Sequence, residues 1–170
     1  MSIVACRVTK DGFQMAADSI SVRGWTQRRT EKPSKLFQID NLIIGSVGSL
    51  EEVALLSLYC STHKLHDDTE RAVLEFFSEF ASWREQRTKE YKIENDYLVG
   101  ICSNRPVVYN VCGWAISRVT DFEAIGAGMD FALAALYLGH GPEKAVETAI
   151  ELCVYCEWPV QVLEWPRTDC

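Results

Sequence analysis

The stretch that decides the fold is residues 1–19, which read MSIVACRVTKDGFQMAADS. Two β-rich runs, Ser2–Val8 and Phe13–Ala17, flank a short polar segment that ends in Asp11-Gly12. Asp-Gly readily adopts the positive φ angles of a tight hairpin turn, so this pattern predicts two neighbouring antiparallel strands. The polar residues 19–34 follow and are expected to form a loop with some extended structure.

Further β-rich runs recur along the chain in pairs joined by short polar turns. They predict a second hairpin, a third hairpin, one short strand and one final strand. The runs are Lys35–Ile39 with Leu42–Val47, Tyr97–Cys102 with Val107–Cys112, Glu123–Ile125, and Val160–Trp165. Residues 113–121 fit no single pattern.

Four helices are expected, in two pairs. Ser49 and Glu52 have the spacing of a capping box, which predicts a helix that runs to about Leu65. A second helix opens at Asp67–Glu70, because apolar residues follow it at helical spacing. The second pair is predicted over Met129–Leu138, stopped by Gly139, and over Glu143–Tyr155, with Pro142 as the first helical residue.

The order of these elements favours an α+β fold over alternating βαβ units. Hairpins imply mainly antiparallel sheets, and the helices fall in segregated pairs. A four-layer αββα sandwich, with two sheets flanked by two helix pairs, would bury every apolar face. The length of 170 residues fits one domain, so residues 1–170 are expected to form a single domain.

Composition excludes several classes of partner. The net charge of −7 argues against binding to nucleic acid or to an anionic membrane. No apolar run has the length of a membrane span, and Ile3–Ala5 is too short for the apolar part of a signal peptide. The seven cysteines are expected to be reduced, and the protein to be cytoplasmic.

Ser2 is a candidate nucleophile. If Met1 is removed, Ser2 carries a hydroxyl and a free α-amine on the same residue. An α-amine has a pKa of about 7.7–8.0, so a useful fraction is an unprotonated base at neutral pH. An N-terminal amine is an established base for a hydroxyl nucleophile.

Several short motifs, in this order and spacing, resemble the landmarks of proteasome β-type peptidases, and most closely the HslV-like ones. The motifs are Ile3-Val4-Ala5, Gly12, Ala16-Ala17-Asp18-Ser19, Lys35–Ile39, Ile44–Gly48, Ala124–Gly128 and Leu152–Cys156. The resemblance runs nearly end to end. It implies the αββα fold of N-terminal nucleophile hydrolases and a ring assembly that encloses the active sites.

The resemblance assigns four site residues. Ser2 would be the nucleophile in place of the family's usual Thr, because it precedes Asp18 by the family's interval of sixteen residues. Asp18 and Lys35 would supply the supporting charges. Gly48 would donate its backbone N–H to the oxyanion, with Ser49 as the neighbouring candidate. A rival register places Met1 at the nucleophile position, which leaves no catalyst there.

The resemblance further implies a peptidase that assembles with itself into rings, possibly a stacked double ring. Polypeptides would be its substrates and an ATP-dependent unfoldase a possible partner. Ala127 departs from the family, which commonly has Ser between two glycines at this place. This departure keeps open a catalytically inactive ring-forming homologue. An amidase of the same fold that acts on a small molecule also stays open, since a fold does not fix a function.

No cofactor or metal is expected. His63, His66 and His140 are interpreted as surface or helix-end residues, since no pattern completes a zinc site. The pair Cys153 and Cys156 is expected inside the last helix as buried residues. Cys6 would be a nucleophile only if residues 1–5 were cleaved. The five tryptophans are expected in the core or at subunit interfaces.

Overall fold

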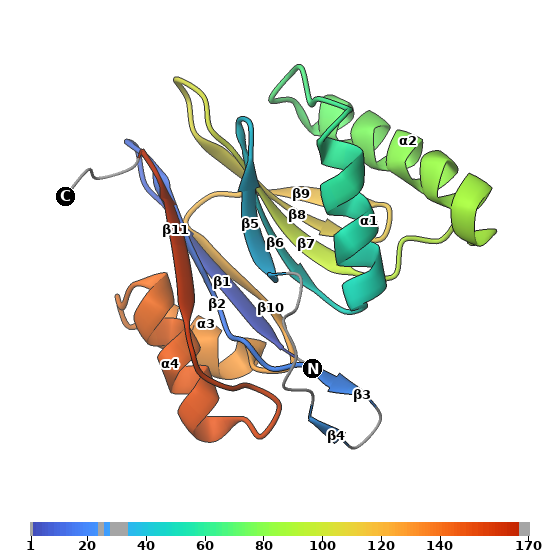
Figure 1. Ribbon diagram of the computed structural model, residues 1–170. Helices are drawn as coiled ribbons and strands as arrows, with labels where there is room; N and C mark the ends of the chain where they lie inside the picture. Colours follow the sequence, from blue (N-terminus) through green and yellow to red (C-terminus); the bar gives the residue numbers. More distant parts are fainter. Residues whose placement is uncertain (1, 24–25, 28–33, 167–170) are drawn as a thin grey trace.

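Two antiparallel sheets face each other in the computed structural model, which describes residues 2–23, 26–27 and 34–166 (Figure 1). The first sheet has the strand order β10-β1-β2-β11. It consists of β1 (Ile3–Val8), β2 (Phe13–Ala17), β10 (Phe122–Gly126) and β11 (Gln161–Trp165). The second sheet follows the chain order, with β5 (Leu36–Ile39), β6 (Leu42–Val47), β7 (Asp96–Ile101), β8 (Val107–Cys112) and β9 (Ala115–Val119). A separate ribbon pairs β3 (Val22–Arg23) with β4 (Thr26–Gln27).

One helix pair covers the outer face of each sheet (Figure 1). The five-stranded sheet carries α1 (Leu50–Cys60) and α2 (Glu70–Thr88). The four-stranded sheet carries α3 (Met129–Tyr137) and α4 (Pro142–Leu152). The α+β class and the αββα layering predicted from the sequence are therefore confirmed.

Side-chain alternation along the strands builds three apolar layers. In β1, Val4 and Cys6 point between the two sheets, whereas Ile3 and Ala5 point toward α3 and α4. In β7, Leu98 joins the layer between the sheets, and its neighbours on either side pack toward α1 and α2. Successive side chains of a strand point to opposite faces, so a strand between two layers must be apolar throughout.

The two sheets approach closely at Gly45 of β6. A Cβ atom at this position would lie 2.5 Å from Cγ1 of Val4 on β1. Likewise, a Cβ atom added to Gly100 of β7 would lie 2.3 Å from the ring of Phe13 on β2. The absence of side chains at these two positions lets β1 and β2 lie against the centre of the other sheet.

Two predicted helix ends are wrong. The first helix ends at Cys60 rather than near Leu65, because the hydroxyls of Ser61 and Thr62 donate to main-chain carbonyls of its last turn. The last helix ends at Leu152 rather than Tyr155, because the backbone of Cys153 is extended. Cys153 and Cys156 therefore lie outside the helix, contrary to the prediction.

The remaining differences concern residues whose pattern was weak. Residues 113–121 contain the edge strand β9. Trp114 and Trp158 are 45% and 50% exposed, so they are not core residues, while Trp83 and Trp165 are half-buried. Trp25 lies outside the described residues.

Within the described residues, no helix has the length and apolar character needed to cross a membrane.

We predict that Gly45→Ala lowers the free energy of unfolding by about 1–3 kcal/mol, because the new methyl group overpacks the contact with Val4. Chemical denaturation measures the change. Ser117→Ala on the exposed edge strand β9 is the control, with an expected change within about 0.5 kcal/mol. Equal stability of the two variants would contradict the close approach of the sheets.

Candidate active site

The carboxylate of Asp18 collects four donors immediately after β2. Its Oδ1 accepts from the backbone N–H of Ile3 at 2.9 Å and from Nζ of Lys35 at 2.7 Å. Its Oδ2 accepts from the backbone N–H groups of Ile20 at 3.0 Å and Glu157 at 3.1 Å. Asp18 is 2% exposed, so this buried charge is both paired and hydrogen-bonded, as a buried carboxylate must be.

Ser2 lies next to this cluster at the start of β1. The Asp18 N–H also donates to the Ile3 carbonyl at 3.2 Å, so main chain and side chain together fix the residue after Ser2. On its other side, the Ser2 carbonyl accepts from the Gly128 N–H at 3.3 Å. A Cβ at Gly126 would lie 2.4 Å from the same carbonyl oxygen. Ser2 is thus enclosed between the Asp18 cluster and residues 126–128, and it is 3% exposed.

Lys35 reaches Asp18 from the other sheet. Its carbonyl accepts from the Ser46 N–H at 2.8 Å, which extends the pairing of β5 and β6 by one residue and fixes the Lys35 backbone. The Lys35–Asp18 ion pair therefore joins the ends of the two facing sheets. Lys35 is 8% exposed, so its ammonium group is largely withdrawn from water and faces the carboxylate.

A pocket of about 220 Å³ opens beside this ion pair. It is lined by Asp18, Ser19, Ile20, Ser34, Lys35, Leu50 and Gln161. Among the described residues that line it, only Asp18 and Lys35 are charged, and they pair with each other, so this part of the pocket suits an uncharged side chain. Ser34 and Gln161 were not predicted as site residues, because nothing in their local sequence distinguishes them from ordinary polar residues.

The turn after β6 presents Gly48, which has a φ of +130°. An added Cβ would lie 2.2 Å from Oδ1 of Asn95, so backbone conformation and contact both require glycine. The Ser49 N–H donates to the same Oδ1 at 2.6 Å. Within the described residues the Gly48 N–H has no hydrogen-bond acceptor. Of the two predicted oxyanion donors, the geometry therefore leaves Gly48 available and occupies Ser49.

Ala127 is exposed on the surface near Ser2. Its carbonyl accepts from the Cys153 thiol at 3.7 Å. None of the described residues buries Ala127, and its side chain carries no hydroxyl.

Two buried cysteines, Cys6 and Cys156, are poorly suited to act as nucleophiles. Burial raises the pKa of Cys6, between the sheets, to about 12. Burial, with the negative charge of Asp18, raises the pKa of Cys156 to about 12 as well. A thiol with such a pKa is almost entirely protonated at neutral pH, and the thiolate is the reactive form.

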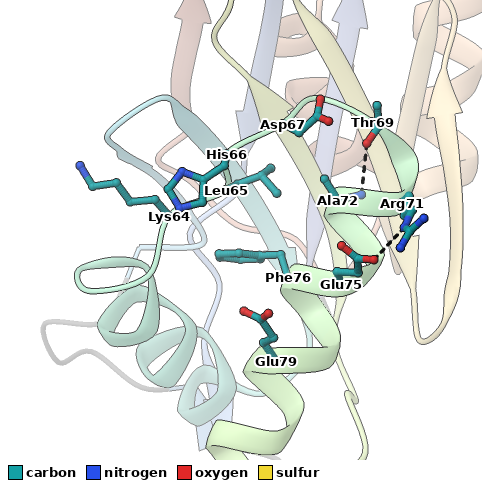
Figure 2. A pocket seen from close by; sticks show the side chains of 10 residues that line it. All are labelled: Lys64, Leu65, His66, Asp67, Thr69, Arg71, Ala72, Glu75, Phe76 and Glu79. Carbon is teal, nitrogen blue, oxygen red and sulfur yellow. Dashed lines mark hydrogen bonds and ion pairs between the residues drawn. The ribbon is translucent and has the colours of Figure 1, made fainter.

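A larger pocket of about 330 Å³ lies between α2 and the segment that joins it to α1 (Figure 2). Its charged side chains are of both signs, and Arg71 is paired with Glu75 at 2.8 Å. None of the predicted site residues lines this pocket. His66 does, but the described part of the chain has no group of three residues suited to hold a metal ion.

Comparison with known proteins identifies the fold. No family model matches the chain, and no curated protein matches it. The solved structure of Thiobacillus denitrificans BPH in complex with epoxomicin, a proteasome inhibitor, superposes with a TM-score of 0.85 at 16% identity, covering 95% of this chain and 97% of that one. A second structure of the same protein gives 0.82 at 16% identity, covering 95% and 96%. At this identity the likeness shows that the two chains share a fold.

We predict that Asp18→Asn lowers the free energy of unfolding by about 3–5 kcal/mol, because it removes the carboxylate that pairs with the buried Lys35 ammonium. Denaturant titration measures the loss. The control is Asp121→Asn, which breaks the ion pair of Arg7 with an aspartate that is 62% exposed and costs about 0–1 kcal/mol. Similar small losses in both variants would show that the Asp18 cluster does not stabilise the fold.

Proposed function

We propose that this chain is a proteasome-like peptidase subunit whose nucleophile is the hydroxyl of Ser2, exposed as the N-terminal residue by removal of Met1. The observation that carries the proposal is the buried ion pair of Lys35 and Asp18. Asp18 also accepts a hydrogen bond from the N–H of Ile3, the residue that follows Ser2. A positive charge fixed beside a hydroxyl and an amine favours the alkoxide and the unprotonated base.

The proposed reaction is acyl transfer in two halves. Oγ of Ser2 attacks the substrate carbonyl carbon, and the Ser2 α-amine takes the hydroxyl proton. The carbonyl oxygen becomes an oxyanion that accepts from the Gly48 N–H. The intermediate collapses to an ester on Ser2, and the departing amine takes the proton. Water then attacks the ester with the α-amine again as base, which releases the acid and restores Ser2.

Lys35 and Asp18 have separate roles in this scheme. The Lys35 ammonium stabilises the developing alkoxide and discourages protonation of the nearby α-amine. Asp18 holds the ammonium in place and keeps it charged, and its remaining bonds fix the backbone around Ser2. This division needs neither a metal nor a cofactor.

Two observations support peptides as substrates. One structural neighbour with the same fold is complexed with epoxomicin, a proteasome inhibitor. The pocket of about 220 Å³ beside Lys35 has room for one uncharged side chain of a substrate. A catalytically inactive subunit is the second candidate, and the exposed Ala127 favours it because no hydroxyl supports the α-amine there.

We further propose that the chain assembles with itself into a ring. Most of the exposed large apolar side chains that the structure describes lie on the α3–α4 layer and the turn after it, and they make up the apolar surface of this layer. Its members include Tyr137 at 80% exposure, Leu138 at 74%, Leu152 at 59% and Val154 at 85%. Such a concentration on one layer is typical of an interface. If the rings enclose the sites, folded substrates need an ATP-dependent unfoldase.

We predict that Ser2→Ala abolishes hydrolysis of a fluorogenic peptide, whereas Ser2→Thr retains it, because only the hydroxyl is required. In an intact-mass measurement after treatment with epoxomicin, the wild-type chain should gain the mass of one inhibitor molecule, and the Ser2→Ala chain should gain none. Wild-type turnover by purified Ser2→Ala would contradict the nucleophile assignment. A wild type that is inert in both assays would favour the inactive subunit.

We predict that native mass spectrometry finds a closed oligomer, and that Leu138→Asp combined with Val154→Asp shifts it toward the 19.2 kDa chain by charging the apolar surface. The control is Leu74→Asp on α2, where the side chain is 40% exposed outside this surface. A stable wild-type monomer would contradict ring assembly and favour the small-molecule amidase.

A further inference from the structure

We propose that Asn95 is a positioning residue of this active site, which holds the Gly48–Ser49 turn so that the Gly48 N–H faces the reacting carbonyl. The inference rests on the proposed function. It concerns a residue just before β7, 46 positions along the chain from Ser49, that no sequence motif identified.

Asn95 bonds to both sides of the turn. Its Oδ1 accepts from the Ser49 N–H at 2.6 Å, and its Nδ2 donates to the Ser49 carbonyl at 2.9 Å. Nδ2 also donates to Oγ of Ser46 at 3.1 Å, which ties the amide to β6 as well. A side chain that donates and accepts on one residue fixes the rotation of both adjacent peptide groups. The Gly48 N–H belongs to the peptide group between Val47 and Gly48, one peptide before those two. That peptide lies between Ser46 and Ser49, both of which bond to the Asn95 side chain. Oδ1 of Asn95 also lies against Gly48, 2.2 Å from the position of an added Cβ. Asn95 therefore restricts the Gly48 N–H by anchoring the chain on both sides of it.

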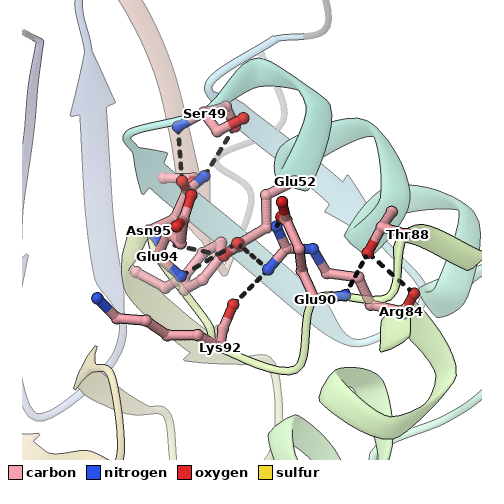
Figure 3. A network of polar contacts seen from close by, with 10 residues as sticks. Ser49, Glu52, Arg84, Thr88, Glu90, Lys92, Glu94 and Asn95 are labelled. Atoms are coloured by element: carbon pink, nitrogen blue, oxygen red, sulfur yellow. Dashed lines mark hydrogen bonds and ion pairs between the residues drawn. The ribbon is translucent and has the colours of Figure 1, made fainter. Parts of the chain in front are cut away.

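Asn95 is itself held by a buried network (Figure 3). The carboxylate of Glu52 accepts from the backbone N–H groups of Glu94 and Asn95, both at 3.1 Å. Arg84 of α2 pairs with Glu52 at 2.8 Å, and the Tyr97 hydroxyl donates to it at 2.7 Å. Glu52 and Arg84 are 0% and 4% exposed. The network anchors Asn95 to α1, α2 and β7 together.

This arrangement replaces the capping box predicted at the start of α1. In a capping box, Glu52 would accept from the Ser49 N–H and the Ser49 side chain would cap the helix. Instead, the Ser49 side chain makes no capping bond, and Glu52 faces inward. Asn95 accepts from the Ser49 N–H in its place. One donor of the turn is thereby satisfied internally, and the neighbouring Gly48 N–H is left for a substrate.

The test compares Asn95→Ala with Tyr59→Phe. Asn95→Ala should lower kcat on a fluorogenic peptide roughly 10- to 100-fold with little change in KM, because a misplaced donor weakens only the transition state. Tyr59→Phe removes another polar contact of α1, to Glu79 at 3.3 Å, and should leave kcat unchanged. Asn95→Ser, which keeps a small polar side chain in the buried site, is measured alongside as the variant less disruptive to folding.

Amide hydrogen exchange provides a readout that does not depend on turnover. The Ser49 amide should be protected in the wild type and should exchange rapidly in Asn95→Ala and Asn95→Ser. Unchanged kcat in both Asn95 variants, or a Ser49 amide that stays protected in them, would overturn the inference. A wild type without turnover would overturn the proposed peptidase and the catalytic part of the inference. The exchange rate of the Ser49 amide would still test whether Asn95 holds the turn.

Discussion

The carboxylate of Asp18 is the constraint on which the rest of the site depends. It binds the backbone at Ile3, Ile20 and Glu157 and the ammonium of Lys35, so it joins four separate segments at one buried point. Such a charge is tolerated only where each of its hydrogen bonds is made, and this requires the two sheets to meet in one register. The same buried carboxylate of Asp18 therefore stabilises the fold and positions the groups of the proposed active site.

The sequence predicts the layers well, because they follow from local patterns. The β-rich runs of β1 and β2, the Asp11-Gly12 turn and Pro142 at the start of α4 are local signals. They specify the strands, the hairpin and the helix start through neighbouring residues alone. Asp18 and Lys35 could be proposed as partners only through the family resemblance. The structure brings them to 2.7 Å, while their roles in catalysis remain a proposal.

What the sequence does not predict depends on contacts between distant segments. Asn95 reaches Ser49 from the segment just before β7, and so Ser49 and Glu52 suggest a capping box that does not form. The extended backbone at Cys153 ends α4 early although its apolar pattern continues, which moves two cysteines out of the helix. The pocket walls at Ser34 and Gln161 likewise arise only when β5 and β11 come together.

The central claim, that Ser2 acts with its own α-amine, is tested most directly by the N-terminus of the native protein. Intact mass and N-terminal sequencing of protein purified from its own host measure it. The account predicts a chain that begins at Ser2 with an unmodified amine. A native protein that retains Met1, or that carries a blocked amine on Ser2, would have no general base at the site and would contradict the account.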